Sequence, residues 1–167
     1  MKADNISKTC VSFCPYNATS IAYADPFKSN YCVAKCPDLY YGDSSNGYGL
    51  CASVCPSTNY FRDNSTQLCV YTCPAANTSL GTVDTFGDVT SDICVTKCPQ
   101  NYFAQIEINR TCVLVCQSGT WGNPVTRMCI TNPVTDCPSN TWADNFTNLC
   151  VSMCNTNSSN SNQYFYG

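Results

Sequence analysis

The chain has 167 residues, of which 16 are cysteine and none is histidine, and it carries a net charge of −3 at pH 7. Its cysteine content is typical of a disulfide framework, whereas Leu, Ile, Val and Phe together number 31, which is too few for one large hydrophobic core. Without histidine the chain lacks the commonest general base, and its eight basic residues form no cluster, so we expect no enzyme, small-molecule substrate, cofactor or nucleic acid partner.

Paired cysteines recur eight times along the chain, and seven of the pairs have the form Cys-x-x-x-Cys. The first cysteines of successive pairs are 17 to 25 residues apart, which is typical of a repeat array whose modules contact mainly their neighbours. The first five pairs are regular and followed by Pro, and the last three are divergent. In chain order the pairs are Cys10 and Cys14, Cys32 and Cys36, Cys51 and Cys55, Cys69 and Cys73, Cys94 and Cys98, Cys112 and Cys116, Cys129 and Cys137, and Cys150 and Cys154.

Pro, Gly, Asn and Ser interrupt the chain about every ten residues, and no helical periodicity is visible, so we expect short strands and turns. An aromatic residue follows most second cysteines by four or five positions, and we expect it to pack against the nearby disulfide. These residues are Tyr40, Tyr41, Tyr60, Tyr102, Phe103, Trp121 and Trp142. The pattern predicts a small disulfide-rich fold, mainly β and irregular, built as an elongated rod of tandem single-disulfide hairpin modules with no large central core.

The interval between Cys73 and Cys94 is the longest loop, and it carries Asp84, Asp88 and Asp92. Three carboxylates could bind calcium, but their spacing differs from that of an EF-hand loop. We interpret the segment as a solvated acidic loop. Zinc is a further alternative, because 16 thiols could form four sites with four cysteine ligands each, but the Cys-x-x-x-Cys-Pro form and the glycosylation sequons favour disulfides. We therefore expect no metal site.

Disulfides persist in oxidising compartments, so we expect an extracellular or cell-surface protein. No apolar run approaches the roughly 18 residues that a membrane span needs, so any membrane attachment must lie outside this segment. Asn-x-Ser/Thr sequons, which we expect to carry N-linked glycans, occur at seven positions. Three of them lie five residues before the first cysteine of a pair, which would repeat the glycan along the rod. The seven sites are Asn5, Asn17, Asn64, Asn77, Asn109, Asn145 and Asn157.

The two ends of the chain belong to the same repeat, since residues 3–14 and 143–154 share seven identities in twelve positions. We interpret residues 1–167 as one array of about eight modules. Residues 1–10 and 154–167 are then half-modules that complete each other head-to-tail between copies. In this interpretation Tyr164, Phe165, Tyr166 and Gly167 form the interface with the next copy. A continuous backbone from one period into the next, within a longer polypeptide, stays open as an alternative.

The stretch Cys94-Val-Thr-Lys-Cys98-Pro-Gln-Asn-Tyr102, continued by Thr111-Cys112-Val113, resembles the furin-like repeats of growth-factor receptors, which also occur in surface proteins of unicellular eukaryotes. The resemblance implies that the second cysteine of one pair bonds the first cysteine of the next. This shifted scheme joins Cys14 with Cys32, Cys36 with Cys51, Cys55 with Cys69, Cys73 with Cys94, Cys98 with Cys112, Cys116 with Cys129, and Cys137 with Cys150. It leaves Cys10 and Cys154 for a disulfide between protomers. The chain departs from the family pattern after Cys116 and Cys154, which lack the following Pro, and in the long interval from Cys129 to Cys137.

Spacing alone leaves the pairing open. Joining first cysteines to first and second to second, as Cys10 with Cys32 and Cys14 with Cys36, closes every bond inside one chain and leaves none for polymerisation. We favour the shifted scheme, because it places the Cys129 to Cys137 interval in a tolerant linker and leaves one cysteine at each end.

Two functions fit these observations. The first is an extracellular structural protein, a glycosylated protomer or repeat unit of a head-to-tail filament or surface coat whose partners are copies of itself. The alternative is a cysteine-rich ectodomain of a surface receptor or antigen that acts as a spacer or binding module. A contiguous exposed apolar patch would favour the alternative.

Overall fold

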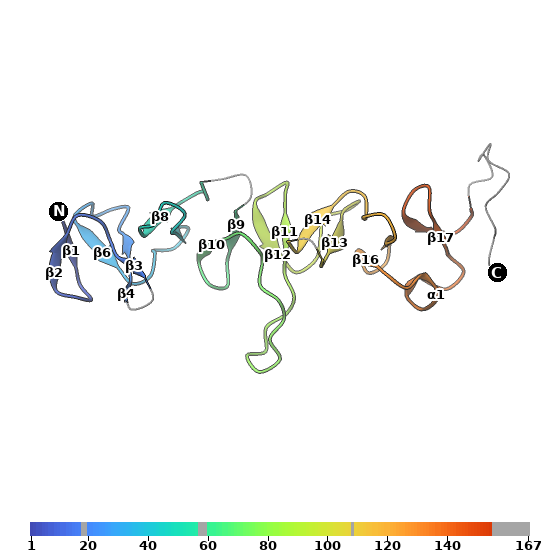
Figure 1. The fold of residues 1–167 in the computed structure, drawn as a ribbon, viewed down its shortest axis with the longest axis horizontal. Coiled ribbons are helices and arrows are strands. Elements are labelled where there is room, and N and C mark those ends of the chain that lie inside the picture. Colours follow the sequence, from blue (N-terminus) through green and yellow to red (C-terminus); the bar gives the residue numbers. More distant parts are fainter. Residues whose placement is uncertain (18–19, 57–59, 108, 155–167) are drawn as a thin grey trace.

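The computed structural model describes residues 1–17, 20–56, 60–107 and 109–154, and over this part the chain forms an elongated rod (Figure 1). Sixteen strands of two or three residues within the described part build one sheet that runs along the rod. They are arranged as eight consecutive hairpins. The prediction of a mainly β, disulfide-rich rod without a large central core is confirmed.

The strands of the sheet divide into first and second strands of the hairpins. The first strands are β1 (Lys2–Asp4), β5 (Tyr23–Ala24), β7 (Tyr41–Asp43), β9 (Phe61–Asp63), β11 (Phe86–Asp88), β13 (Phe103–Gln105), β15 (Trp121–Asn123) and β17 (Trp142–Asp144). The second strands are β2 (Thr9–Val11), β6 (Tyr31–Val33), β8 (Leu50–Ala52), β10 (Leu68–Val70), β12 (Ile93–Val95), β14 (Thr111–Val113), β16 (Met128–Ile130) and β18 (Leu149–Val151). A separate two-stranded sheet pairs β3 (Tyr16–Asn17) with β4 (Ser20–Ile21).

Successive hairpins stack in sequence order through parallel strand pairs. The first strand of each hairpin pairs antiparallel with its own second strand and, in every hairpin but the last, parallel with the second strand of the following hairpin. The parallel register is constant: the middle residue of the first strand lies opposite the residue before the next hairpin's first cysteine, as Gly122 lies opposite Leu149. Among the described strands, this order leaves one edge of β2 and one edge of β17 without a neighbour.

In seven of the eight hairpins, the turn is closed by the polar residue that ends or follows the first strand. The Asp63 carboxylate accepts hydrogen bonds from the Ser65 amide at 2.9 Å and from the Thr66 hydroxyl at 2.7 Å. Such local bonds make Asp a strong turn former, and they allow its carboxylate to be buried with its polar atoms paired. A residue with positive φ then leads the chain into the second strand. It lies two positions before the cysteine of that strand, as Gln67 does with φ 57°. The turn is therefore set locally, without help from a core.

Packing is concentrated between neighbouring hairpins. Phe86 packs with Ala104 of the next hairpin and with Cys98 and Cys112, the disulfide that joins the two. The middle residue of the first strand is Gly or Ala in most hairpins, although β9 has Arg62 there. A small residue is needed where an aromatic ring lies close: a Cβ built on Gly87 would overlap the ring of Phe61. Many small interfaces of this kind take the place of a single core.

The aromatic residues singled out in the sequence have different surroundings. Phe103 packs against Cys116 and Cys129, as expected, and Tyr102 packs at the edge of the Phe86 cluster. Tyr60 makes an edge-on ring contact with Tyr71, and Tyr40 makes one with Phe27. Trp142 is an exception to the expected packing, because it is 49% exposed.

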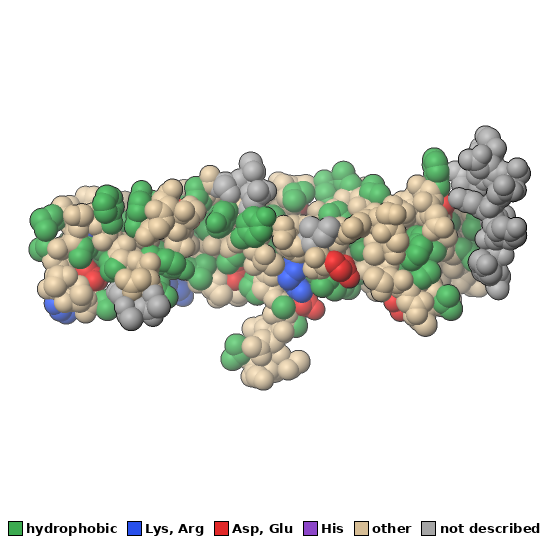
Figure 2. Space-filling model, viewed as in Figure 1, with side chains coloured by type: hydrophobic (Ala, Val, Ile, Leu, Met, Phe, Trp, Pro, Cys, Tyr) green, Lys and Arg blue, Asp and Glu red, His purple; other side chains and the backbone are tan. Residues whose placement is uncertain are grey.

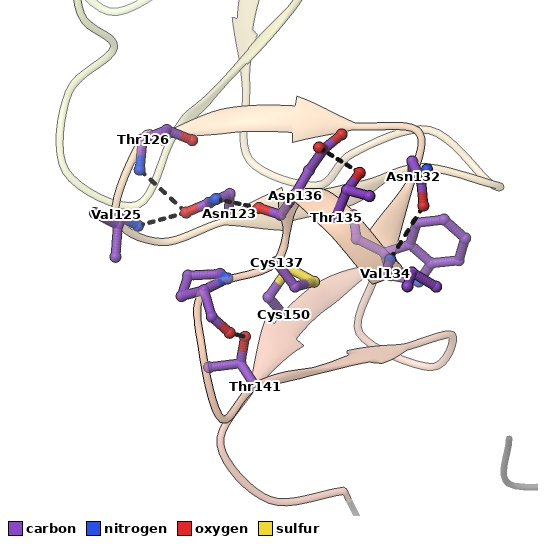
Figure 3. Close-up of a disulfide and its surroundings, with 12 residues drawn as sticks. Asn123, Val125, Thr126, Asn132, Val134, Thr135, Asp136, Cys137, Thr141 and Cys150 are labelled. Atoms are coloured by element: carbon purple, nitrogen blue, oxygen red, sulfur yellow. Dashed lines mark hydrogen bonds between the residues drawn. A yellow bond between two sulfur atoms is a disulfide. The ribbon is translucent and has the colours of Figure 1, made fainter. Parts of the chain in front are cut away.

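One turn of helix, α1 (Pro133–Asp136), lies in the long interval between Cys129 and Cys137, where we expected only strands and turns (Figure 3). Asn132 caps it by accepting a hydrogen bond from the Val134 amide at 3.2 Å, and Pro133 occupies the first turn, where its missing N–H costs nothing. The Asp136 carbonyl also accepts a hydrogen bond from Asn123 at 2.7 Å. The inserted residues thus pack back onto the preceding hairpin.

The interpretation of residues 84–92 as a solvated acidic loop is wrong for Asp88. This residue lies in β11 and is 4% exposed, because its carboxylate closes the β11–β12 turn by accepting bonds from Thr90 and Ser91. Asp84 instead forms an ion pair with Arg110. The carboxylates are therefore engaged in separate structural contacts.

Candidate assembly site at the two ends of the rod

The structure contains seven disulfides within its described residues, and each joins two consecutive hairpins. In every case the second cysteine of one pair bonds the first cysteine of the next, with Cα atoms 5.5 to 5.7 Å apart. These are the pairs of the shifted scheme. The bonded pairs are Cys14 with Cys32, Cys36 with Cys51, Cys55 with Cys69, Cys73 with Cys94, Cys98 with Cys112, Cys116 with Cys129, and Cys137 with Cys150.

The two remaining cysteines lie at opposite ends of the rod (Figure 1). Cys10 is exposed on β2, and the half-buried Cys154 follows β18. Cys10 stands at the position of a first cysteine and Cys154 at that of a second. These are the two partners that every internal disulfide joins across a hairpin boundary.

Each open edge of the sheet accompanies one of these cysteines. The β2 edge lies at the N-terminal end and the β17 edge at the C-terminal end. Inside the rod, the same two edges always face each other, as in the parallel pairing of β15 with β18. The two ends are therefore complementary in backbone as well as in sulfur chemistry.

Hydrogen bonds govern the electrostatics of the hairpin turns. The Ser7 hydroxyl and the Ile6 amide donate to Asp4 and lower the pKa of its carboxyl below the ordinary 3.8. Burial raises the pKa of the Asp88 carboxyl, but hydrogen bonds from Ser91 and Thr90 outweigh burial and hold the pKa below its usual value. Both carboxylates are thus stabilised in their charged form at neutral pH.

Six of the seven sequon asparagines lie in described, exposed positions, and Asn157 lies outside the described residues. Asn5, Asn64 and Asn145 occupy the same place in their hairpins, directly after the residue that closes the turn. Asn77 lies in a loop that projects from the rod between β10 and β11 (Figure 1). Exposure at a turn suits an acceptor of a bulky, hydrated glycan.

The expected interface residues Tyr164, Phe165, Tyr166 and Gly167 lie outside the described residues, as does most of the expected half-module at 154–167.

Sequence reasoning missed the polar residue that closes seven of the eight hairpin turns. Five hairpins carry it six positions before the first cysteine, and a search for that spacing would have found it. These residues are Asp4, Asp63, Asp88, Asn123 and Asp144. It also missed the tripeptide of an aromatic, a small and a polar residue, which recurs as Tyr-Gly-Asp, Phe-Gly-Asp, Trp-Gly-Asn and Trp-Ala-Asp.

No protein-family model matches this chain, no curated protein matches it, and no solved structure matches it. Over the described residues, no helix is long and apolar enough to cross a membrane. In the same part of the chain, no three His, Cys, Asp or Glu side chains gather as metal ligands would. The disulfide-rich fold is of a kind typical of extracellular proteins.

Proposed function

We propose that the protein is an extracellular structural protomer whose copies join head to tail through a disulfide between Cys154 of one copy and Cys10 of the next. The observation that carries the proposal is the pair of unbonded cysteines at opposite ends of the rod. Each occupies the position of a partner that is bonded at every internal boundary. The contact is heterologous, so repeating it produces an open filament unless the rotation closes a ring.

Bond formation oxidises the two thiols to one disulfide and releases two protons and two electrons. A disulfide of an oxidoreductase or a small-molecule disulfide accepts the electrons and is reduced to two thiols. Such reagents are available where extracellular proteins fold, which is also the compartment in which the seven internal bonds persist.

N-linked glycans belong to the same proposal. The exposed Asn5, Asn64 and Asn145 recur at one position of the hairpin, so sugars there would repeat along the filament. A glycan coat keeps a rod with exposed apolar side chains hydrated. On the face shown in Figure 2, hydrophobic side chains are spread along the rod and charged ones are sparse.

The resemblance to furin-like repeats also stays a proposal. Its support is the shifted pairing, which the seven internal disulfides follow.

The proposal is tested by the size of the secreted full chain on denaturing gels, with free thiols blocked, before and after reduction and deglycosylation. We expect a ladder of multimers that collapses on reduction and deglycosylation to a species near 18.2 kDa. Cys10→Ser should stop growth at the dimer, the largest species that Cys154 alone can link, and the exposed Ser12→Ala is the matched control.

Monomers in both conditions would contradict the filament. They would favour the ectodomain, for which the projecting loop, with Leu80 74% and Val83 60% exposed, is the strongest binding feature. A very large species that survives reduction would instead mean a tandem-repeat polypeptide.

A further inference from the structure

We propose that the open edge of β17 in one copy pairs in parallel with the open edge of β2 in a second copy, in the register that the internal hairpins use. This inference rests on the head-to-tail assembly proposed above and specifies its contact surface. It places Ala143 of one copy opposite Thr9 of the next. Four separate contacts inside the chain define what this junction contains.

The first contact is a backbone hydrogen bond. In the internal hairpins, the amide of the middle residue of a first strand donates to the carbonyl two positions before the next hairpin's first cysteine. Three such bonds have N···O distances of 2.8 Å: Gly122 to Asn148, Ala104 to Arg127, and Gly87 to Arg110. The acceptor residue has positive φ in each case, and Lys8, with φ 57°, has the same conformation. The amide of Ala143 and the carbonyl of Lys8 are the corresponding groups at the two ends.

The second contact is apolar. Phe86 is 3% exposed because Ala104 of the next hairpin lies against it. The corresponding residues at the junction are Trp142, which is 49% exposed, and Ala3 of the second copy. The counterparts of Trp142 that have a following hairpin are either buried, as Phe103 is, or half-buried, as Trp121 is, so the exposure of Trp142 fits an end at which no described hairpin follows. Ala3 has the same side chain as Ala104, which packs against the ring of Phe86 inside the rod.

The third contact is a side-chain hydrogen bond. The Tyr41 hydroxyl donates to Asn64 Oδ1 at 2.6 Å, and Trp121 Nε1 donates to Asn145 Oδ1 at 3.1 Å, each from one hairpin to the next. Trp142 continues this series, and its acceptor is Asn5 of the second copy. Because Oδ1 accepts the bond, Nδ2 stays available for a glycan. Glycosylation of Asn5 is therefore compatible with the junction.

The fourth contact is the disulfide between Cys154 and Cys10 of the second copy. It would pack beside Trp142 as the bond between Cys98 and Cys112 packs beside Phe86. Unpaired strand edges are ready templates for pairing with another chain. The C-terminal end of the rod presents the donor of Ala143, the ring of Trp142 and the thiol of Cys154. The N-terminal end presents the matching acceptor, small residue and thiol, so the occupant that fits is a second copy of this chain.

The register is tested by cross-linking in the full chain with Cys10→Ser and Cys154→Ser. Ala143→Cys is introduced in one preparation and Thr9→Cys in another, and the two are mixed with a disulfide oxidant. Opposed residues of paired strands lie about 5 Å apart, within the range of a disulfide. We expect these two variants to cross-link much faster than Ala143→Cys with Val11→Cys, which lies two residues further along the same face.

Adding Trp142→Ala should slow the cross-linking about 30-fold, the loss expected when an aromatic anchor leaves the centre of an interface. Phe146→Ala is the matched control. Phe146 is exposed on the same hairpin, and its counterpart Val125 stays 68% exposed although both neighbouring hairpins are present. It should leave the rate unchanged, and intact mass with seven disulfides shows that each variant has folded.

Two results would overturn the register: equal rates for Thr9→Cys and Val11→Cys, or preferential linking of Ala143→Cys to itself. If the native chain still forms its reducible ladder in that case, the Cys154–Cys10 filament stands and only the edge pairing fails. Loss of both the ladder and the cross-link would remove the proposed function as well.

Discussion

The hairpins β13–β14 and β17–β18 are built alike but differ in their surroundings. Both begin with an aromatic residue, followed by Ala, and both have a cysteine in the second strand. Phe103 of the first is 8% exposed, whereas Trp142 of the second is 49% exposed. The difference comes from the following hairpin, which covers β13, whereas no strand among the described residues covers the outer edge of β17. Burial in this rod therefore belongs to the boundary between two modules and not to either module alone.

Removal of a boundary disulfide should give the largest difference between interior and ends. Replacing Cys98 and Cys112 together by Ala should cost about 3 to 5 kcal/mol, because the bond closes a short loop in a module with almost no core. Cys10→Ser should leave the stability of the monomer unchanged, because this cysteine is unbonded within the chain. Native-state hydrogen exchange of β11 to β14 measures the local free energy of opening. Equal protection in the two variants would contradict the comparison.

Removal of the aromatic residue should have the next largest effect. Phe103→Ala should lower the free energy of local opening by about 3 kcal/mol, because it empties the cluster around Cys116 and Cys129. Trp142→Ala should change it by less than about 0.5 kcal/mol in the monomer, since half of that ring already contacts water. Hydrogen exchange of β15–β16 and β18 reports the two effects. In the assembled filament, Trp142→Ala should instead lower the free energy of local opening more than it does in the monomer. If the variant has no effect there, the boundary contacts do not extend between copies.

Removal of a turn carboxylate should have a smaller effect on stability, and the effect should differ between the β9–β10 and β17–β18 hairpins. Asp63→Ala should cost about 2 kcal/mol, because the turn loses a buried carboxylate that accepts hydrogen bonds from Ser65 and Thr66. Asp144→Ala should cost about 1 kcal/mol, since Asp144 makes similar bonds to Phe146 and Thr147 but is only partly buried. Hydrogen exchange at the two turns, followed across a urea titration, measures the two losses in free energy. A larger loss of stability for Asp144→Ala than for Asp63→Ala would mean that burial does not determine how much these hydrogen bonds stabilise the turn.

The sequence was sufficient to predict the rod, because the cysteine period fixes the size of a module and the scarcity of aliphatic residues excludes a single core. The parallel register was not predictable from the sequence. It depends on one backbone bond between hairpins and on the fit of a ring such as Phe61 over a small residue such as Gly87. These contacts join residues that are about 25 positions apart and carry no periodicity of their own. The buried Asp was missed because a carboxylate in a turn was assumed to face water.

The smallest predicted effect concerns pH and compares the β11–β12 turn with the β15–β16 turn. Asp88 closes the first by accepting from Thr90 and Ser91, and Asn123 closes the second by accepting from Val125 and Thr126. The geometry is shared, but only the acid can titrate. Because the pKa of Asp88 in the folded chain lies below the ordinary 3.8, its ionised form stabilises the turn above that pH.

The stabilisation from Asp88 is lost as pH falls below 3.8 through the folded pKa, since protonation removes the charge that the turn donors favour. Exchange rates corrected for intrinsic chemistry should therefore rise at the β11–β12 turn between about pH 5 and pH 2, while those at the β15–β16 turn stay level. Asp88→Asn should abolish the rise, because it converts the first turn into the chemistry of the second. A rise that persists in this variant would place the acid sensitivity elsewhere, with Asp84 and its bond to Arg110 as the nearest source, because hydrogen bonds from the Ala76 amide and from Arg110 also lower the pKa of that carboxyl.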